Sequence, residues 1–321
     1  KMVDELKPFL VDLVKEVVGK QKNIPKPNYK FPIAKQRELC HEIAEKLGYN
    51  LAAGRIDESS HPFAMGLHPS DVRITVRYDE NDLWMGMGSV IHETGHALYD
   101  QGLVAQHFGT ALAENISLGI HESQSRLWEN MVGKSEEFME FIFPYIKKSF
   151  PDFSLSAKEY YRYLNAVAPT LVRTESDEVT YNLHIIIRFE IEKDLIEGKI
   201  TAAETPRVWN EKYKKYLGIE VPNDTQGILQ DIHWSGGSFG YFPTYTLGNL
   251  YAAQLWDTIN KKIPTIMSQI AAGDFGELLA WLRTNIHVHG RKYSAEELIT
   301  QITGAKPDAK FFKEYLAKKY L

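Results

Sequence analysis

The amino-acid sequence predicts a mainly helical fold with one small β-sheet. Apolar residues recur every three or four positions through most of the 321 residues, which is the spacing of a helix face. The period changes to strict alternation between Val72 and Tyr78, where every second residue is apolar. No repeat, low-complexity tract or linker interrupts the chain, so we expect a single domain over residues 1–321. Its length exceeds that of the usual single domain, so the alternative is two closely associated domains.

The first predicted elements are two helices separated by a connector. Residues 2–18 place a row of apolar side chains on one side of a helix, and residues 35–47 form a second helix that Gly48 closes. Three prolines between residues 21 and 32 mark the connector. Later helices are predicted over residues 115–131, 156–167, 176–198 and 201–217, from Thr246 onward, and in the tail from Asp308.

Two segments depart from the helical pattern. The alternating stretch from Val72 to Tyr78 is a predicted strand, and as an edge strand it would pair with an extended peptide. The alternative is that it forms one strand of a small hairpin. Residues 222–243 contain four glycines and are predicted to form a long irregular loop, which in a compact protein is more often functional than idle.

The composition is that of a globular protein and gives no sign of a nucleic-acid partner. Apolar residues make up 44% and charged residues 25% of the sequence, and the formal net charge of -5 is mild. The single cysteine, Cys40, excludes an intrachain disulfide and fits a reducing compartment, so we expect a cytoplasmic location. No apolar run approaches the ~18 residues of a membrane span, and the first residues carry no signal-peptide pattern.

The most informative motif is His92-Glu93-Thr94-Gly95-His96, which has apolar residues on both sides. Positions four apart share a helix face, so both imidazoles can reach one metal ion. Glu93 follows the first histidine directly, where it can contact a water held by that metal. The arrangement suits metal-activated hydrolysis of an amide, and the alternative is a chance match of five residues.

Two imidazoles leave the metal site incomplete, because a catalytic zinc takes three protein ligands. The metzincin pattern fails, since Tyr99 and Gly102 stand where it requires Gly and His. The third ligand is therefore expected to be a carboxylate on a second helix, with Glu114, Glu122 and Glu129 as candidates. Spacing favours Glu122 only mildly, and the alternative for the other two is an ordinary surface charge.

Six short segments stand in order along the chain between His61 and Trp234. They are His61-Pro62-Phe63, Asp71-Val72-Arg73-Ile74-Thr75, His92-Glu93-Thr94-Gly95-His96, His121-Glu122-Ser123-Gln124, Val172-Arg173-Thr174-Glu175-Ser176-Asp177 and Gly227-Ile228-Leu229-Gln230-Asp231-Ile232-His233-Trp234. Together they resemble the motifs of the M32 metallocarboxypeptidases. The fifth segment departs from the usual pattern at Val172 and Ser176 but keeps its Arg and Asp.

The resemblance implies a gluzincin-like helical metallopeptidase with a small sheet beside the metal-binding helix and a deep substrate groove. Family members carry a long helical segment ahead of the first motif, and only sixty residues precede His61 here. We therefore expect the chain to be a catalytic domain that corresponds to the C-terminal two-thirds of the family and lacks that N-terminal segment.

The resemblance also implies the activity, a broad-specificity carboxypeptidase that hydrolyses the last bond of peptides with a free C-terminus. One divalent metal, zinc with cobalt as the alternative, would be held by His92, His96 and Glu122. Glu93 would take a proton from the attacking water and pass it to the leaving amine. A homodimer is implied as well.

A carboxypeptidase needs a cation for the terminal carboxylate, and Arg173 is the first candidate because its planar fork can bind both oxygens. The alternative is an ion pair of Arg173 with Asp177 or Glu178. Arg73 and Arg188 are the next candidates for the anchor.

Donors for the oxyanion are expected in the glycine-rich loop and just after it. His233 is the first candidate, and its alternative is a structural hydrogen bond to Asp231 or to the backbone. Tyr241 and Tyr245 are further substrate-binding candidates, with ordinary aromatic packing as the alternative. His61, Asp71 and Arg73 are expected to line the groove or to support the metal ligands.

An imidazole that ligates a metal usually donates its other N–H to a carboxylate or a carbonyl. Asp71 is one expected acceptor, and Asp177 or Glu178 could serve instead.

Two other functions remain open from the sequence. A helical gluzincin endopeptidase or oligopeptidase would share the metal site but lack the carboxylate anchor. A catalytically impaired fragment would bind metal and peptide without turnover, although the intact Glu93 argues against this.

Overall fold

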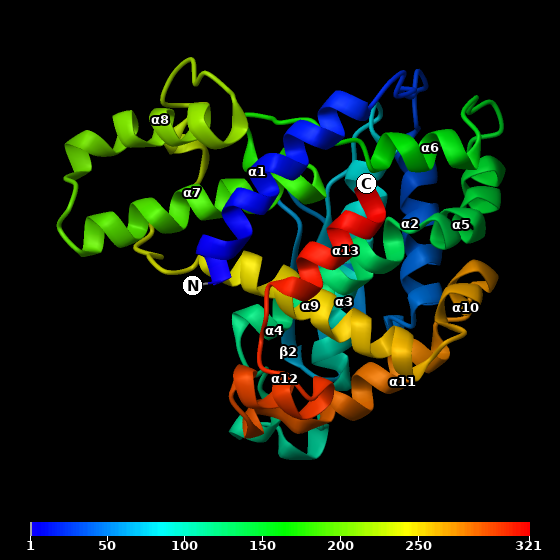
Figure 1. Ribbon diagram of the computed structural model, residues 1–321. Coiled ribbons are helices and arrows are strands. Elements are labelled where there is room, and N and C mark those ends of the chain that lie inside the picture. The colour runs from blue at the N-terminus through cyan, green and yellow to red at the C-terminus, as the bar shows by residue number, and fades with distance from the viewer. Residues whose placement is uncertain (1) are drawn as a thin grey trace. The chain divides into compact units, whose positions relative to one another are not determined.

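The computed structural model describes residues 2–321 and confirms a mainly helical fold with one small sheet (Figure 1). The chain divides into two compact units. Unit 1 comprises residues 2–23, 165–250 and 308–321, and unit 2 comprises residues 24–164 and 251–307. Within residues 2–321, no helix has both the length and the apolar character needed to cross a membrane.

Unit 1 is built around α7 (Glu178–Ile196), which is buried on almost every side in its middle turns. Asp177 caps this helix by accepting hydrogen bonds from the backbone of Val179 and Thr180. Helices α1 and α8 pack against α7, and α13 packs against α1 (Figure 1). The helical elements of unit 1 are α1 (Met2–Lys20), η5 (Arg173–Glu175), α7, η6 (Ala202–Glu204), α8 (Thr205–Leu217), η7 (Ile228–Gln230), the start of α9 (Pro243–Lys262) and α13 (Lys310–Tyr320).

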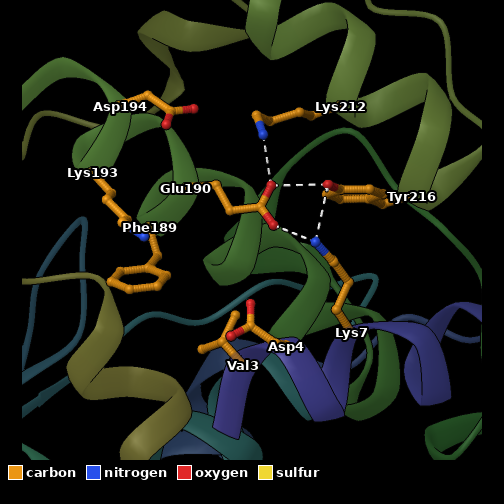
Figure 2. Close-up of a pocket in the computed structure, with 9 residues that line it drawn as sticks. All are labelled: Val3, Asp4, Lys7, Phe189, Glu190, Lys193, Asp194, Lys212 and Tyr216. Atoms are coloured by element: carbon orange, nitrogen blue, oxygen red, sulfur yellow. Dashed lines mark hydrogen bonds and ion pairs between the residues drawn. The ribbon is translucent and has the colours of Figure 1, made fainter. Parts of the chain in front are cut away.

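A polar cleft of about 300 Å³ in unit 1 lies where α1 meets α7 and α8 (Figure 2). At its centre the Glu190 carboxylate accepts hydrogen bonds from Lys7 and Lys212, both at 2.6 Å, and from Tyr216 at 2.9 Å. Because these groups satisfy one another, the cluster ties the three helices together.

Unit 2 contains the sheet and the remaining helices. Gly48 adopts a left-handed conformation with a φ of 101° and ends α2, as the sequence predicts. Cys40 lies on this helix and is fully buried. The helical elements of unit 2 are α2 (Ile33–Leu47), η1 (Leu51–Ala53), α3 (Leu83–Gly102), η2 (Ala105–His107), η3 (Ala111–Ala113), α4 (Leu118–Arg126), η4 (Leu127–Gly133), α5 (Glu136–Ser149), α6 (Ala157–Leu164), the rest of α9, α10 (Ile266–Ala272), α11 (Gly276–Asn285), η8 (His287–Lys292) and α12 (Ala295–Thr303).

The sheet has three strands in the order β1-β3-β2, with β1 (Gly54–Glu58) parallel and β2 (Phe63–His68) antiparallel to β3 (Asp71–Val76). The predicted strand is therefore central, and the expectation that it is an edge strand is wrong. The alternative, a strand of a small hairpin, is confirmed by its pairing with β2. The sequence did not reveal β1, because its residues do not alternate between buried and exposed positions.

The predicted helix over residues 115–131 is divided in two. It begins at α4, where the Ser117 side chain accepts a hydrogen bond from the backbone of Ile120, and from Leu127 it continues as the π-helical turn η4. Wide turns of this kind are rare and often occur at functional sites.

Candidate metal centre

Helix α3 carries the two histidines of the central motif. Its start is fixed by Asp82, whose side chain accepts a hydrogen bond from the backbone of Trp84. His92 and His96 are one turn apart, so their rings project from the same face, with centroids 4.9 Å apart. Both side chains are mostly buried.

Helix α4 approaches α3 closely at Gly95. A β-carbon at Gly95 would lie 2.7 Å from the Cα of Ser125 and 2.8 Å from the carbonyl oxygen of Gln124. Only glycine permits this approach, which brings Glu122 of α4 to the two histidines. The Glu122 Oε2 atom is 3.7 Å from His92 Nε2 and 3.3 Å from His96 Nε2.

The atoms that these three residues offer as ligands all lie within 4.8 Å of one another. Two imidazole nitrogens and one carboxylate oxygen are the donors found in catalytic zinc sites that leave a position for water. The donor set of His92, His96 and Glu122 therefore fits a divalent ion.

The charge of Glu122 is stabilised inside the protein. Burial alone would raise the pKa of this carboxyl, but the Arg126 guanidinium and the imidazoles of His92 and His96 outweigh it and hold the pKa well below its usual range. Arg126 Nε donates to Glu122 Oε1 at 2.7 Å, which leaves Oε2 directed at the histidines.

Glu129 supports the first histidine, and the expectation that it is a surface charge is wrong. Its carboxylate is mostly buried, and its Oε2 lies 2.8 Å from His92 Nδ1. It also accepts a hydrogen bond from Arg126 at 3.1 Å. The spacing of seven residues from Glu122, two helical turns, was a signal that could have placed both carboxylates on one face. Glu114 is confirmed as a surface charge, since it is half exposed and pairs with Arg291.

The second histidine is supported differently. His96 Nδ1 lies 2.5 Å from the Nδ1 atom of His121, and His121 Nε2 lies 3.0 Å from Asp100 Oδ1. Asp100 follows His96 by one turn on α3, a spacing that could have been read from the sequence. Asp71, which we expected to accept from a ligand imidazole, instead holds Arg73 at 2.8 and 2.9 Å. That expectation is wrong because β3 directs Asp71 and Arg73 to each other on the exposed face of the sheet.

Glu93, the candidate base, is buried on α3 between the two histidines in sequence. Burial, together with the neighbouring carboxylates of Glu122 and Glu129, outweighs the His92 imidazole and raises the pKa of Glu93 to about 7. A carboxyl with a pKa near neutrality is suited to exchange a proton during catalysis.

Arg173 lies in unit 1 and its ion-pair partner is Asp231, so the alternative reading, an ion pair with Asp177 or Glu178, is wrong. Arg173 donates to Asp231 Oδ1 from Nε at 3.0 Å and from Nη2 at 2.8 Å. Arg188 approaches the other carboxylate oxygen, Oδ2, with its Nη2 at 2.6 Å. Asp177 is occupied by its helix cap, and Glu178 by Lys319 and Tyr320 of α13.

The candidate oxyanion donors cluster in the same unit as Arg173. His233 Nε2 is 3.4 Å from the Tyr245 hydroxyl, and its ring packs against Phe242 with centroids 4.4 Å apart. Tyr241 also contacts the His233 ring. The distance from His233 Nδ1 to Asp231 Oδ1 is 3.9 Å, which is too long for a hydrogen bond between these two side chains.

Comparison with known proteins places this geometry in a family. The chain belongs to the carboxypeptidase Taq (M32) metallopeptidases, whose family model matches residues 1–320. It is 43% identical over 98% of its length to thermostable carboxypeptidase 1 of Thermus thermophilus and 41% identical over 99% to thermostable carboxypeptidase 1 of Pyrococcus furiosus. The chain spans 62% and 64% of the length of these two relatives.

Solved structures confirm the fold. The chain superimposes on a structure of the protein CHT with a TM-score of 0.97 at 48% identity, covering 99% of this chain and 65% of that one. For a structure of the Pyrococcus furiosus carboxypeptidase, the TM-score is 0.96 at 40% identity, with 100% and 66% covered. The family and the donor set together support one divalent metal at this centre.

Proposed function

We propose that this protein is a metal-dependent carboxypeptidase that releases the C-terminal residue of peptides. The observation that carries the proposal is the convergence of His92, His96 and Glu122 beside the buried Glu93, in a chain of a metallopeptidase family. Relatives named carboxypeptidase, which this chain matches along nearly its whole length, support it further.

When bound, the divalent ion would be held by these three residues and would polarise water and the carbonyl of the bond to be cut. Glu93 accepts a proton from the attacking water at its carboxylate and then delivers that proton to the nitrogen of the leaving amine. Arg126 and Glu129 keep Glu122 and His92 in their ligating orientations through the hydrogen bonds described above.

The family resemblance supports roles for two further residues. His233 donates a hydrogen bond to the oxygen that gains charge in the transition state. Arg173 binds the terminal carboxylate of the peptide. Arg173 and Arg188 share the single carboxylate of Asp231, so this cluster retains one net positive charge, which supports an anionic ligand.

The finer assignments rest on the donor set and on the family resemblance. The metal is zinc, with cobalt as the alternative that the same donors accept. Tyr241, Tyr245, His61, Asp71 and Arg73 contact the peptide. The protein acts as a cytoplasmic homodimer, and residues 1–321 form one catalytic domain.

A matched pair of peptides tests this function. The zinc-loaded protein is given one peptide with a free C-terminus and the same peptide with a C-terminal amide, and the products are identified by mass. Release of the last residue from the free peptide alone is the expected result. Cleavage of internal bonds in both peptides would instead indicate an endopeptidase. Stoichiometric zinc without turnover would indicate a catalytically impaired fragment.

A further inference from the structure

The imidazole of His96 contacts the imidazole of His121 through the ring nitrogen that does not face Glu122. Its Nε2 atom faces Glu122 at 3.3 Å, while its Nδ1 atom lies 2.5 Å from His121 Nδ1. The other ring nitrogen of His121 lies 3.0 Å from Asp100 Oδ1. The side chains of all three residues are at most 16% exposed, so water does not compete freely for these contacts.

These contacts allow one arrangement of protons when His96 binds a metal through Nε2. That nitrogen then presents its lone pair, so the ring proton of His96 is on Nδ1 and is donated to His121 Nδ1. A neutral imidazole has one N–H, so His121 carries its own proton on Nε2 and donates it to Asp100. The hydrogen bonds are thus donated in one direction, from His96 to His121 and from His121 to the Asp100 carboxylate.

We propose that His121 and Asp100 are positioning residues that fix the orientation and tautomer of His96 for metal binding. The proposal rests on the metal site of the proposed function and extends it to two residues that do not touch the metal. His92 is held by the Glu129 carboxylate directly, whereas His96 is held by a carboxylate acting through an intervening imidazole. Loss of such supporting partners typically costs 10–100-fold in metal affinity.

Gly66 of strand β2 extends this support to the sheet. A β-carbon at Gly66 would lie 2.7 Å from Asp100 Oδ2 and 3.0 Å from its Cγ. The backbone at Gly66 is not left-handed, so alanine is compatible with its conformation. The Gly66→Ala change therefore displaces the Asp100 carboxylate without altering any ligand or either positioning residue.

The test measures zinc affinity by competition with a chromophoric chelator. Asp100→Asn, His121→Leu and Gly66→Ala should each weaken zinc binding about 10–100-fold. His121→Asn should recover part of the loss, because its amide oxygen can accept from His96 Nδ1 but cannot reach Asp100. Asp57→Asn is the control. Asp57 lies on β1 of the same sheet and its carboxylate pairs with Arg55, so zinc affinity should stay within about threefold of wild type.

A second readout is the tautomer of His96 and of His121 in the zinc-loaded wild type. Nitrogen NMR of the histidines shows which ring nitrogen carries the proton. The proposal requires that His121 carry its proton on Nε2 and that His96 carry its proton on Nδ1. Thermal melting of the metal-free variants separates a general loss of folding from a loss of metal binding.

The outcomes distinguish a failure of the proposed metal site from a failure of the positioning role of His121 and Asp100. If the wild type binds no stoichiometric zinc, the metal site itself is wrong. If the wild type binds zinc but Asp100→Asn and Gly66→Ala bind it equally well, the positioning role is overturned. A His121 ring protonated on Nδ1 in the zinc-loaded protein would overturn it as well.

Discussion

The close contact between α3 and α4 gives a quantitative prediction for Gly95→Ala. The new β-carbon would stand 2.7 Å from the Cα of Ser125, and because carbon atoms settle about 3.5–4.0 Å apart, the helices must separate by roughly 1 Å. The obstacle is backbone on both sides, so a side-chain rotation cannot relieve it. The separation moves Glu122 away from the two histidines of α3.

A metal site tolerates far less movement than this, since ligand distances are held within about 0.2 Å. We therefore expect zinc affinity to fall at least about tenfold, which corresponds to about 1.4 kcal/mol. Overpacking should also lower the free energy of unfolding of the metal-free protein by about 1–3 kcal/mol. Alanine favours a helix over glycine by roughly 0.5–1 kcal/mol, so neither loss can arise from weaker helix propensity.

Gly88→Ala is the matched control, on the same helix and two turns earlier. Its β-carbon would lie 2.6 Å from the ring of Trp84, a partly exposed side chain that can turn away. Chelator competition and urea unfolding are measured for both variants. The reasoning is refuted if Gly95→Ala binds zinc within about threefold of the wild type, or if Gly88→Ala weakens zinc binding as much as Gly95→Ala does.

Four further predictions concern individual side chains. Glu93→Gln should keep one equivalent of zinc but lower turnover at least about a hundredfold, because the general base is lost. Glu122→Ala should lose zinc on dialysis against a mild chelator, whereas Glu114→Ala, at an exposed ion pair, should retain it. Arg173→Ala should raise KM for free-C-terminus peptides and lower kcat/KM by roughly 30-fold or more, as expected for a lost charge-assisted pair. Asp231→Asn should lower the free energy of unfolding by about 3 kcal/mol at pH 7, because two arginines lose their shared carboxylate.

The effect of Asp231→Asn on the free energy of unfolding should depend on pH, and its direction follows from the pKa of Asp231. Burial raises the pKa of Asp231, but Arg188 and Arg173 lower it by more, so the net shift is downward from 3.8. A carboxyl with a depressed pKa stabilises the fold above its unfolded pKa and loses that contribution as the pH falls. In urea unfolding of the metal-free protein, the difference between the wild type and Asp231→Asn should shrink below about pH 4. A constant difference would contradict the ion-pair explanation.

Clear contradictions exist for the other three variants. Glu93 is not the base if Glu93→Gln keeps more than about a tenth of the activity. Full retention of zinc by Glu122→Ala would move the third ligand to another carboxylate. Equal rejection of an amidated peptide by the wild type and Arg173→Ala would leave Arg173 as a structural partner of Asp231.

Local signals in the sequence predicted much of the fold. The end of α2 followed from Gly48, because only a left-handed residue closes that helix in this way. The alternation from Val72 to Val76 correctly identified buried positions of β3. Spacing within one helix likewise predicted that His92 and His96 would share a face.

Interaction partners that come from segments distant in the sequence could not be predicted as well. Periodicity reports which face of an element is buried but not which residue lies across from it. Asp231 follows Arg173 by 58 residues, so the nearer Asp177 was a natural but wrong choice for its ion pair. The central position of β3 was hidden for the same reason, because β1 pairs with it from a segment that carries no strand signal of its own.

The alkylation rate of Cys40, the single cysteine of the chain, would report local opening of the structure. Cys40 is fully buried on α2, and burial raises the pKa of its thiol, so a folded molecule has no reactive thiolate to offer. Alkylation therefore requires unit 2 to open, and its rate is proportional to the fraction of molecules that are open. A ligand that binds only the closed form reduces that population by a factor of one plus the ratio of its concentration to its Kd. Zinc bound through residues of unit 2 would thus be recorded as slower labelling of a cysteine that never touches it.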